Sequence, residues 1–594
     1  MKFYKTYNEK KQQCLLCNHY CILKEGQTGM CGVNKNVDGK VECLVYGYPA
    51  VVHVDPVEKK PLFQFLPNTK ILSIGSVGCN FACPFCQNHG ISQEHNINKS
   101  QYLSPEDIVN IAIAKDCESI AYTYNEPTIF YPYARDISIL AHERGLKTVY
   151  VSNGYESDEV IKDMPGIIDA INIDLKSFDK KYYKRVLRGD LPVQLENIKK
   201  FHKSDIWVEI TTLIIPTKND SDEELTKIAE FIASVDTKIP WHISAFHPDY
   251  KQMDLDFTPL DTLERAYKIG KKAGIKQIYM GNLGQSNPTN CLSCGFEVIS
   301  RTTYDTTKDL RKNGDTCPMC NEKLNGIFKS IRESSVAGSF YPNNCYEVTH
   351  HITQFNKFLE NSDFIPKLEF KPKAIIVPHA GYIYSGFTAN AAYSLLETLS
   401  PKRVLVIGPS HRVAFKGASV IPFDEFQTPC RNIQIDKEYS NELIKEFDFI
   451  DFNEDAHHEH STETQMPFIH YYLPNAKVVE IVYGDISYEE ISKIVSKALA
   501  DHEDTFVVIS TDFSHFHDLK TANHLDGIGL EAIKKLDLDI WNSGTEACGR
   551  IGVKALLKSS NEFSLKSRVL DYRTSFETTK DDQSVVGYVS AIIG

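Results

Sequence analysis

The sequence predicts an α/β protein with more than one domain, and three observations lead to this class. A chain of 594 residues is too long for a single hydrophobic core. Between residues 70 and 282, short apolar runs alternate with segments whose apolar residues return every three or four positions. In the second half, three strongly apolar runs each end in a turn that carries histidine. Alternating strands and helices predict parallel sheets with right-handed crossovers.

Composition and charge limit the kinds of function. The hydrophobic fraction of 42% and the charged fraction of 24% are ordinary for a soluble protein. No apolar run reaches transmembrane length or resembles a signal-peptide core, so we expect a cytoplasmic protein that does not contact a membrane. The net charge of −13 weighs against a general polyanion-binding surface. Nucleic acid is therefore not indicated, although a local basic patch leaves tRNA open as a substrate.

Cysteine is frequent and mostly clustered. Sixteen cysteines without an export signal are expected to be ligands and thiols rather than disulfides. Most of them fall in motifs with metal-ligand spacing. Four stand alone, and each is expected to behave as a small buried apolar residue: Cys43, Cys117, Cys345 and Cys430.

The first half predicts a full or partial (β/α) barrel. The strand-like runs span residues 70–74, 119–122, 148–151, 170–173, 206–210, 241–245 and 277–279. Chemistry in such barrels lies at the carboxyl ends of the strands. Polar residues follow four of these runs, namely Asn125 with Glu126, Asn153, Asp174 with Lys176, and His247. Each is compatible with a surface loop, but their placement at successive strand ends favours an active site.

Three cysteines directly after the first of these runs are the most informative motif. Cys79, Cys83 and Cys86 have the spacing Cys-x3-Cys-x2-Cys. Three thiolates can hold three irons of a [4Fe–4S] cluster and leave the fourth iron without a protein ligand. A structural zinc site is the alternative. Zinc knuckles usually come as paired Cys-x2-Cys units, so this spacing favours the cluster.

The residues around this motif resemble a known family. The segment Asp55-Pro56-Val57-Glu58-Lys59-Lys60-Pro61-Leu62, with Gly78–Phe81 and Cys86–Asn88, resembles the radical S-adenosylmethionine (SAM) component of the AmmeMemoRadiSam system. These proteins are relatives of the pyruvate formate-lyase activating enzyme, and the resemblance covers about residues 10 to 325. It implies that the open iron binds SAM, whose reductive cleavage gives a 5′-deoxyadenosyl radical. It also implies that Asn125 and Glu126 lie near the methionyl amino group, and that other parts of the cofactor contact Asn153, Asp174, Lys176 and His247.

Two further cysteine clusters flank the predicted barrel. The first consists of Cys14, Cys17, Cys21 and Cys31 and suits either structural zinc or an auxiliary iron–sulfur cluster. The glycine-rich segment Gly26–Gly29 resembles a knuckle turn, which favours zinc. The second cluster consists of two Cys-x2-Cys pairs, Cys291 with Cys294 and Cys317 with Cys320. Such pairs predict a structural zinc ribbon, here with an extended loop between them.

The second half predicts an open α/β domain with its own polar site. Apolar runs at 374–377, 404–407 and 506–509 are followed by His379, by His411, and by Asp512 with His515. Continuous apolar runs suit strands that are covered on both faces. Ligands in such sheets bind at the carboxyl ends of the strands. The segments Glu459–Glu463 and Cys548–Arg550 carry further candidate side chains for the same cleft.

This half, residues 331–594, resembles the MEMO family, which shares its fold with the class III extradiol dioxygenases. The resemblance implies that His379, His411 and Cys548 bind a mononuclear iron or copper ion. It places Asp512 and His515 beside them as catalytic groups together with Cys548, and it places His460 and Glu463 in the pocket wall. Two histidines and one thiolate differ from the two-histidine-one-carboxylate set of oxygenases, so dioxygenase activity is not implied.

These motifs predict four segments: a Cys-rich segment at 1–50, the radical SAM barrel at 51–285, a zinc-ribbon-like segment at 286–328 and the MEMO-like domain at 331–594. The predicted function is a radical SAM enzyme of unknown substrate, whose product is processed at the second metal. Two alternatives are a MEMO half that only binds metal or recruits a partner, and a barrel that activates a glycyl-radical protein. An AMMECR-type protein is expected as a separate component, and ferredoxin or flavodoxin as electron donor.

Overall fold

The computed structural model describes residues 3–8, 10–284, 286–361, 368–501 and 503–594. The chain divides into two compact units, Met1–Phe328 and Lys329–Gly594. Residue 285, at the predicted boundary between the barrel and the zinc-ribbon-like segment, lies outside the described residues. The predicted α/β class is confirmed in both units. Within the described part of the chain, no helix has the length and apolar character needed to cross a bilayer.

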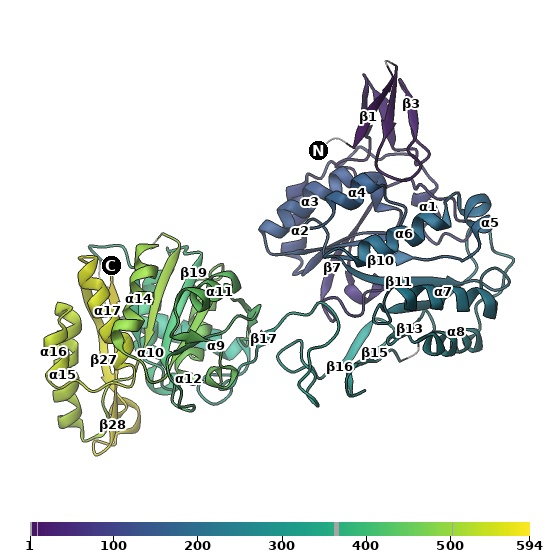
Figure 1. Cartoon of the computed structure of the whole chain (residues 1–594). Helices are drawn as coiled ribbons and strands as arrows, with labels where there is room; N and C mark the ends of the chain where they lie inside the picture. Colours follow the sequence, from purple (N-terminus) through teal and green to yellow (C-terminus); the bar gives the residue numbers. More distant parts are fainter. Residues whose placement is uncertain (1–2, 9, 285, 362–367, 502) are drawn as a thin grey trace. The chain divides into compact units, whose positions relative to one another are not determined.

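The first unit is built on an eight-stranded sheet with neighbours in sequential order (Figure 1). Its strands are β6 (Val51–Pro56), β7 (Lys70–Gly75), β8 (Ser119–Tyr122), β9 (Lys147–Ser152), β10 (Ala170–Asp174), β11 (Trp207–Ile214), β12 (Trp241–Ala245) and β13 (Ile278–Gly281). Strands β7 to β13 are parallel, whereas β6 runs antiparallel to β7. Since β6 and β13 form the two edges of the described sheet, the barrel is the partial form.

Helices connect these strands, and local sequence sets where they begin. They are α1 (His89–Ser92), α2 (Pro105–Ala114), α3 (Tyr131–Glu143), α4 (Asp158–Asp163), α5 (Lys180–Tyr182), α6 (Leu191–His202), α7 (Asp222–Val235) and α8 (Leu260–Ala273). Ser104 and Asp107 form a capping box at the start of α2, and the Ser221 hydroxyl accepts a hydrogen bond from the Glu224 N–H in α7. Such caps satisfy N–H groups that the first turn leaves unpaired.

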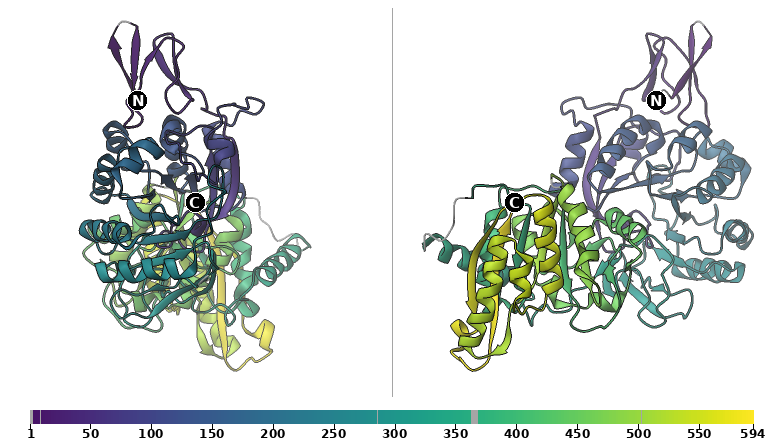
Figure 2. Two further views of the ribbon diagram at one scale, coloured as in Figure 1. Left: turned by 90° about the vertical axis from the view of Figure 1, so that its right-hand side faces the viewer. Right: turned by 60° about the vertical axis from the view of Figure 1, so that its left-hand side comes forward.

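Small strands lie beside the flanking cysteines at both ends of this unit. At the N-terminal end lie β1 (Tyr4–Asn8), β2 (Lys11–Cys14), β3 (Ile22–Lys24), β4 (Asn34–Val37) and β5 (Lys40–Cys43), and at the other end β14 (Thr289–Asn290), β15 (Glu297–Thr302) and β16 (Asp305–Asp309). The hairpin of β1 to β3 projects from the end of the unit (Figures 1 and 2). The second group is anchored by the buried Arg301, which donates hydrogen bonds to the Phe63 carbonyl and Thr289 Oγ1 at 2.8 and 2.7 Å.

The second unit is built on a nine-stranded mixed sheet, with the order β23-β20-β24-β19-β25-β18-β28-β26 and β27 paired to β28. The bounds of these nine strands are β18 (Ala374–Val377), β19 (Arg403–Pro409), β20 (Ala418–Val420), β23 (Ile450–Asp451), β24 (Lys477–Tyr483), β25 (Thr505–Ser510), β26 (His515–His517), β27 (Ser567–Thr574) and β28 (Val585–Ile593). A separate sheet of three short strands contains β17 (Ile331–Arg332), β21 (Glu425–Phe426) and β22 (Ile433–Gln434). The neighbours β24, β19, β25 and β18 are parallel and almost wholly buried, as continuous apolar runs predict.

The helices of the second unit are α9 (Cys345–Asn361), α10 (Tyr382–Tyr393), α11 (Lys437–Glu446), α12 (His460–Glu463), α13 (Met466–Tyr472), α14 (Tyr488–Ala500), α15 (Leu519–Lys535), α16 (Leu538–Asn542), α17 (Arg550–Glu562) and α18 (Phe576–Thr579). Two apolar cores lie in this unit. One contains α14, α15 and α17, and the other contains α9, α10 and α13.

The expectation that lone cysteines remain thiols is wrong for one pair. Cys345 and Cys430 form a disulfide with their Cα atoms 4.4 Å apart, a separation that suits such a bridge. Cys345 begins α9, and Cys430 lies between β21 and β22, 85 positions later. Only the fold brings them together, so sequence spacing gave no sign of the pair. Cys117 is buried, as expected, and Cys43 is half-buried.

Candidate functional site

A pocket lies where the parallel strands of the first unit end. The residues Cys79, Cys83, Cys86, Asn125, Glu126, Asn153, Asp174 and Lys176 all line it. They come from the loop after β7 and from the ends of β8, β9 and β10. Parallel strands present their carboxyl ends at one edge, which explains why residues distant in sequence meet here. The sequence prediction of a shared site therefore agrees with the geometry for these side chains.

Two asparagines hold the cysteine loop against the strand ends. Asn125 donates hydrogen bonds to the Gly78 carbonyl at 2.8 Å and to Ser76 Oγ at 3.0 Å. Asn153 donates to Asn80 Oδ1 at 2.8 Å. Among the described residues Asn153 Oδ1 has no partner, although it is buried. A buried unpaired acceptor is costly, so this atom fits a site that a ligand with N–H or O–H groups completes.

Burial disfavours ionisation of two of the three thiols, Cys79 and Cys83. Burial raises the pKa of Cys83 to about 12, against the opposing effect of the Lys176 ammonium. Burial also raises the pKa of Cys79 well above its usual value. Lys176 forms an ion pair of 2.8 Å with Asp174, and this pair raises the pKa of the lysine in spite of its burial. Because iron supplies positive charge to its thiolate ligands, three such thiols around an accessible pocket fit a [4Fe–4S] cluster.

Glu126 is hydrogen-bonded to neighbouring residues of the first unit, and it shares one of these partners with a second carboxyl group. Its carboxylate accepts the Asn153 N–H at 2.8 Å and the Thr128 hydroxyl at 2.6 Å. Ser152 Oγ lies 2.9 Å from Glu126 and 2.5 Å from Glu156. Burial, followed by the charge of Glu126, raises the pKa of Glu156 to about 8. Sequence reasoning missed Glu156, whose only signal was its position just beyond the polar end of β9.

Charged groups that the sequence did not place in the site also line this pocket. Lys60 forms a buried ion pair of 2.7 Å with Asp55, and its ammonium lies 4.5 Å from the centre of the Tyr124 ring. On β12, His242 Nε2 lies 2.6 Å from the Glu209 carboxylate. The predicted residue His247 does not belong to the pocket lining, and its Nδ1 lies 3.4 Å from the Pro248 carbonyl. The histidine inside the strand, rather than the one after it, faces the pocket.

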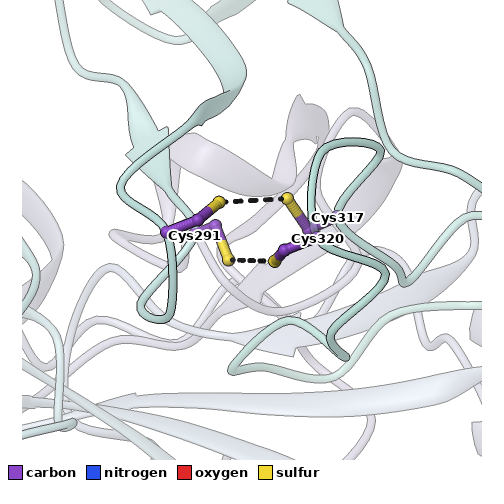
Figure 3. A group of neighbouring side chains, drawn as sticks. Cys291, Cys317 and Cys320 are labelled. Carbon is purple, nitrogen blue, oxygen red and sulfur yellow. Dashed lines mark hydrogen bonds between the residues drawn. The ribbon is translucent and has the colours of Figure 1, made fainter.

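The zinc-ribbon cysteines form a tight group of four. Cys291 Sγ lies 3.6 Å from Cys320 Sγ, and Cys294 Sγ lies 3.7 Å from Cys317 Sγ (Figure 3). All four sulfurs lie within 4.8 Å of one another. Tetrahedral ligands placed at the usual zinc–sulfur distance are about 3.8 Å apart. The group therefore fits a closed structural zinc site.

In the second unit, ligand-type side chains meet at the ends of β18, β19 and β25. Ligand atoms of His379, His411 and Cys548 lie within 4.8 Å of one another, with Cys548 Sγ 3.2 Å from His379 Nε2. Burial, followed by the charges of His411 and His460, lowers the pKa of His379 well below its usual value. A neutral imidazole is the form that binds metal. This set fits a single metal ion with two nitrogen ligands and one sulfur ligand.

Carboxylates orient these ligands. Asp512 accepts the His379 backbone N–H at 2.8 Å, and its own N–H donates to Cys548 Sγ at 3.2 Å. Burial raises the pKa of Asp512, while the charges of His515 and His460 act in the opposite direction. His515 begins β26 and is half-buried. Asp512 and His515 are thus near the three ligands, as the resemblance implies.

Glu459, rather than Glu463, serves the histidine group. Glu459 accepts the His411 N–H at 2.6 Å and lies 2.7 Å from His460 Nδ1. Burial opposes ionisation, but the hydrogen bonds from His411 and His460 hold the pKa of Glu459 far below its usual range. Glu463, which the resemblance places in the pocket wall, makes its contacts with the segment at the start of this unit. Its carboxylate pairs with Arg332 and accepts the Val336 N–H at 2.8 Å.

Comparisons with known proteins divide the chain in the same way. The Radical SAM superfamily model matches residues 73–232, and the Memo-like protein model matches residues 332–592. An uncharacterized protein of Methanocaldococcus jannaschii is 38% identical over 328 residues, which are 54% of this chain and 97% of that protein. A MEMO1 family protein of Aquifex aeolicus is 34% identical over 274 residues, which are 44% of this chain and 98% of that protein.

Solved structures resemble the first unit only distantly. A domain of pyruvate-formate lyase-activating enzyme from Bacteroides vulgatus is 17% identical with a TM-score of 0.25, and the match covers 28% of this chain and 99% of that chain. The two family models confirm the predicted fusion of a radical SAM domain with a MEMO domain. The first unit contains a region that matches the Radical SAM superfamily, and the chain belongs to the MEMO1 family through its second unit.

Proposed function

We propose that Cys79, Cys83 and Cys86 hold a [4Fe–4S] cluster and that SAM binds beside it in the pocket at the strand ends. The single observation that carries this proposal is one pocket lined by three thiols and by Asn153, whose buried Oδ1 has no partner in the described chain. When bound, the cluster supplies the electron that cleaves SAM to a 5′-deoxyadenosyl radical, which then removes hydrogen from a substrate.

The chain's own residues orient and enclose this site. Asn125 fixes the start of the cysteine loop through Gly78, and Asn153 fixes it through Asn80. Lys176, paired with Asp174, places a positive charge near Cys83 and stabilises its thiolate. Reduction requires a one-electron donor, for which a ferredoxin- or flavodoxin-type protein has suitable chemistry. An AMMECR-type protein remains our proposed partner on the basis of the family resemblance.

Formation of 5′-deoxyadenosine tests this proposal. The full chain is reconstituted anaerobically with iron and sulfide and then mixed with dithionite and SAM. We expect 5′-deoxyadenosine from the wild type and none from Cys83→Ala. The control is Cys117→Ala, because Cys117 is buried in the same unit but lies outside the pocket lining. A reconstituted wild type that leaves SAM intact, or a Cys83→Ala chain that still cleaves it, would contradict the proposal.

We also propose that the MEMO domain holds a redox-active iron or copper ion through His379, His411 and Cys548. The close approach of their ligand atoms supports a metal at this point, and Asp512 beside them supplies a proton-accepting group. This favours processing of the radical product over a purely structural role. In the full chain, His379→Ala should remove about one metal ion per chain, whereas His470→Ala should not. A wild type that binds no redox-active metal here would favour the partner-recruiting alternative.

A further inference from the structure

The spacing of sulfur atoms distinguishes the metal sites of the first unit. Four thiolates on one zinc ion must lie close together, as those of Cys291 and its three partners do. In a cubane each thiolate binds a different iron, so the sulfurs lie further apart. Among the described residues, Cys79, Cys83 and Cys86 are not within the 4.8 Å spacing that the zinc-ribbon group meets. The proposed cluster site and the zinc site thus differ in the spacing of their sulfur atoms.

The N-terminal cysteines have the wider spacing. Cys14, Cys17, Cys21 and Cys31 line one small cavity, yet within the described chain no three of them meet the 4.8 Å criterion. The four cysteine side chains therefore share one cavity without forming a group as tight as the zinc-ribbon cysteines. Gly29 also lines the cavity, and an added Cβ there would be in ordinary contact with Cys21 Sγ at 3.6 Å. The knuckle-like turn that favoured zinc in the sequence therefore belongs to a wider site.

The same cavity contains hydrogen-bond donors suited to sulfur. Asn34 Nδ2 donates to Cys31 Sγ at 3.4 Å. Asn80 also lines the cavity and is 2% exposed, and in the part of the chain that the structure describes its Nδ2 has no partner. Donors of this kind tune iron–sulfur clusters through hydrogen bonds to their sulfurs. The unpaired Asn80 amide is an independent sign that a ligand completes this cavity.

We propose that Cys14, Cys17, Cys21 and Cys31 bind a second [4Fe–4S] cluster, fully ligated by protein, rather than zinc. This cluster lies next to the loop of the first one. An added Cβ at Gly78 would lie 2.4 Å from the Cys31 carbonyl oxygen, so the two loops are in close backbone contact. His19 Nε2 lies 2.9 Å from the carbonyl oxygen of Asn80, the residue after Cys79. With four protein thiolates this cluster has no open iron and cannot bind SAM.

Metal content tests the second cluster independently of SAM cleavage. The full chain, reconstituted with iron and sulfide, should contain about eight irons, four for each cluster. A chain with Cys79→Ser, Cys83→Ser and Cys86→Ser together should retain about four irons and the electron paramagnetic resonance signal of a reduced [4Fe–4S] cluster. It should form no 5′-deoxyadenosine. The proposed function requires only the cluster of Cys79, Cys83 and Cys86. Iron that is retained without SAM cleavage therefore tests the second cluster separately.

The matched pair of variants is Cys14→Ser and Cys43→Ser. Cys43 lies close to Cys14 and Cys31 but does not line the cavity, and its Sγ is 3.8 Å from the Ile129 carbonyl. Cys14→Ser should lose about half of the iron, whereas Cys43→Ser should keep all of it. Magnetic coupling between the two clusters should broaden the electron paramagnetic resonance signal of the reduced wild type. This broadening should be absent from Cys14→Ser and from the triple-serine chain. Zinc in place of iron in the triple-serine chain, or no broadening in a wild type with both clusters, would overturn the proposal.

Discussion

Buried carboxyl groups support the sites of both units, and their pKa values are shifted in opposite directions. Glu126 and Glu156 share the Ser152 hydroxyl, and burial raises the pKa of both. Glu459 is also buried, but His411 and His460 hold its pKa far below the usual range. The difference follows from the partners, because hydroxyl and amide donors compensate a buried charge less than two imidazole groups do. Each shift leads to its own test.

Stability of the first unit should fall as pH rises toward 8, because the folded chain holds a proton on Glu156 that the unfolded chain releases near pH 4.5. In that window the folded state binds more protons, so the free energy of unfolding decreases with pH. Glu156→Gln replaces the neutral acid by a neutral amide. Between pH 5 and 8, we expect the free energy of unfolding to fall by about 1–2 kcal/mol less in Glu156→Gln than in the wild type.

Thermal unfolding of the anaerobic chain at both pH values measures this difference. Glu94→Gln is the control, because Glu94 is exposed and its substitution leaves the buried pair intact. An equal drop in melting temperature for wild type and Glu156→Gln would show that Glu156 is ionised in the folded chain.

Metal affinity of the MEMO domain should depend on Glu459, although Glu459 is not one of the three proposed ligands. Its carboxylate accepts the backbone N–H of His411 at 2.6 Å. It also lies 3.2 Å from Nδ1 of the His411 ring, a contact that orients the other ring nitrogen toward the ligand group. Loss of such an outer partner typically weakens metal binding by about 10–100-fold. Glu459→Gln should do so in a competition titration with a chelator. The exposed Glu489→Gln serves as control, and unchanged affinity in Glu459→Gln would refute the orienting role.

Among the structural elements, strands were the most predictable and the contacts between loops the least. The apolar runs predicted β7 to β12, β18, β19 and β25, because a strand that is buried on both faces is apolar along its whole length. Cysteine and histidine at strand ends also stand out by their chemistry. Glu156 gave no comparable signal, because a carboxylate in a loop usually faces solvent. The bridge of Cys345 with Cys430 depends on a contact across 85 positions that no local pattern reports.

The disulfide should stabilise the second unit by restricting its unfolded chain. It joins the start of α9 to the segment between β21 and β22 and closes a loop of 85 positions. The chain-entropy model assigns about 4 kcal/mol to a loop of this size, and engineered examples deliver less. Cys345→Ser and Cys430→Ser should therefore lower the free energy of unfolding equally, and the double variant should lower it no further. A bridge absent from the folded protein would instead leave both thiols open to alkylation without reductant.

At the scale of the whole molecule, two metal-site systems share one chain but have separate cores. Every buried apolar cluster among the described residues lies within Met1–Phe328 or within Lys329–Gly594. The ligand groups follow the same division. Sites without a shared core or shared partners usually respond to substitution independently. On the proposed function, fusion would raise the effective concentration of the product of the first site for the second site.

Substitutions in the two units should therefore act independently on SAM cleavage and on metal binding by the MEMO domain. Substitutions in either unit should impair processing of the product. His379→Ala should leave 5′-deoxyadenosine formation within about twofold of wild type, and Cys83→Ala should leave the metal of the MEMO domain in place. Anaerobic assays of SAM cleavage and metal analysis of both full-length variants measure these two quantities. The double variant should show the sum of the single defects. If His379→Ala alone abolished SAM cleavage while the iron of the first unit remained, the two sites would be coupled, and the MEMO metal would take part in the radical step itself.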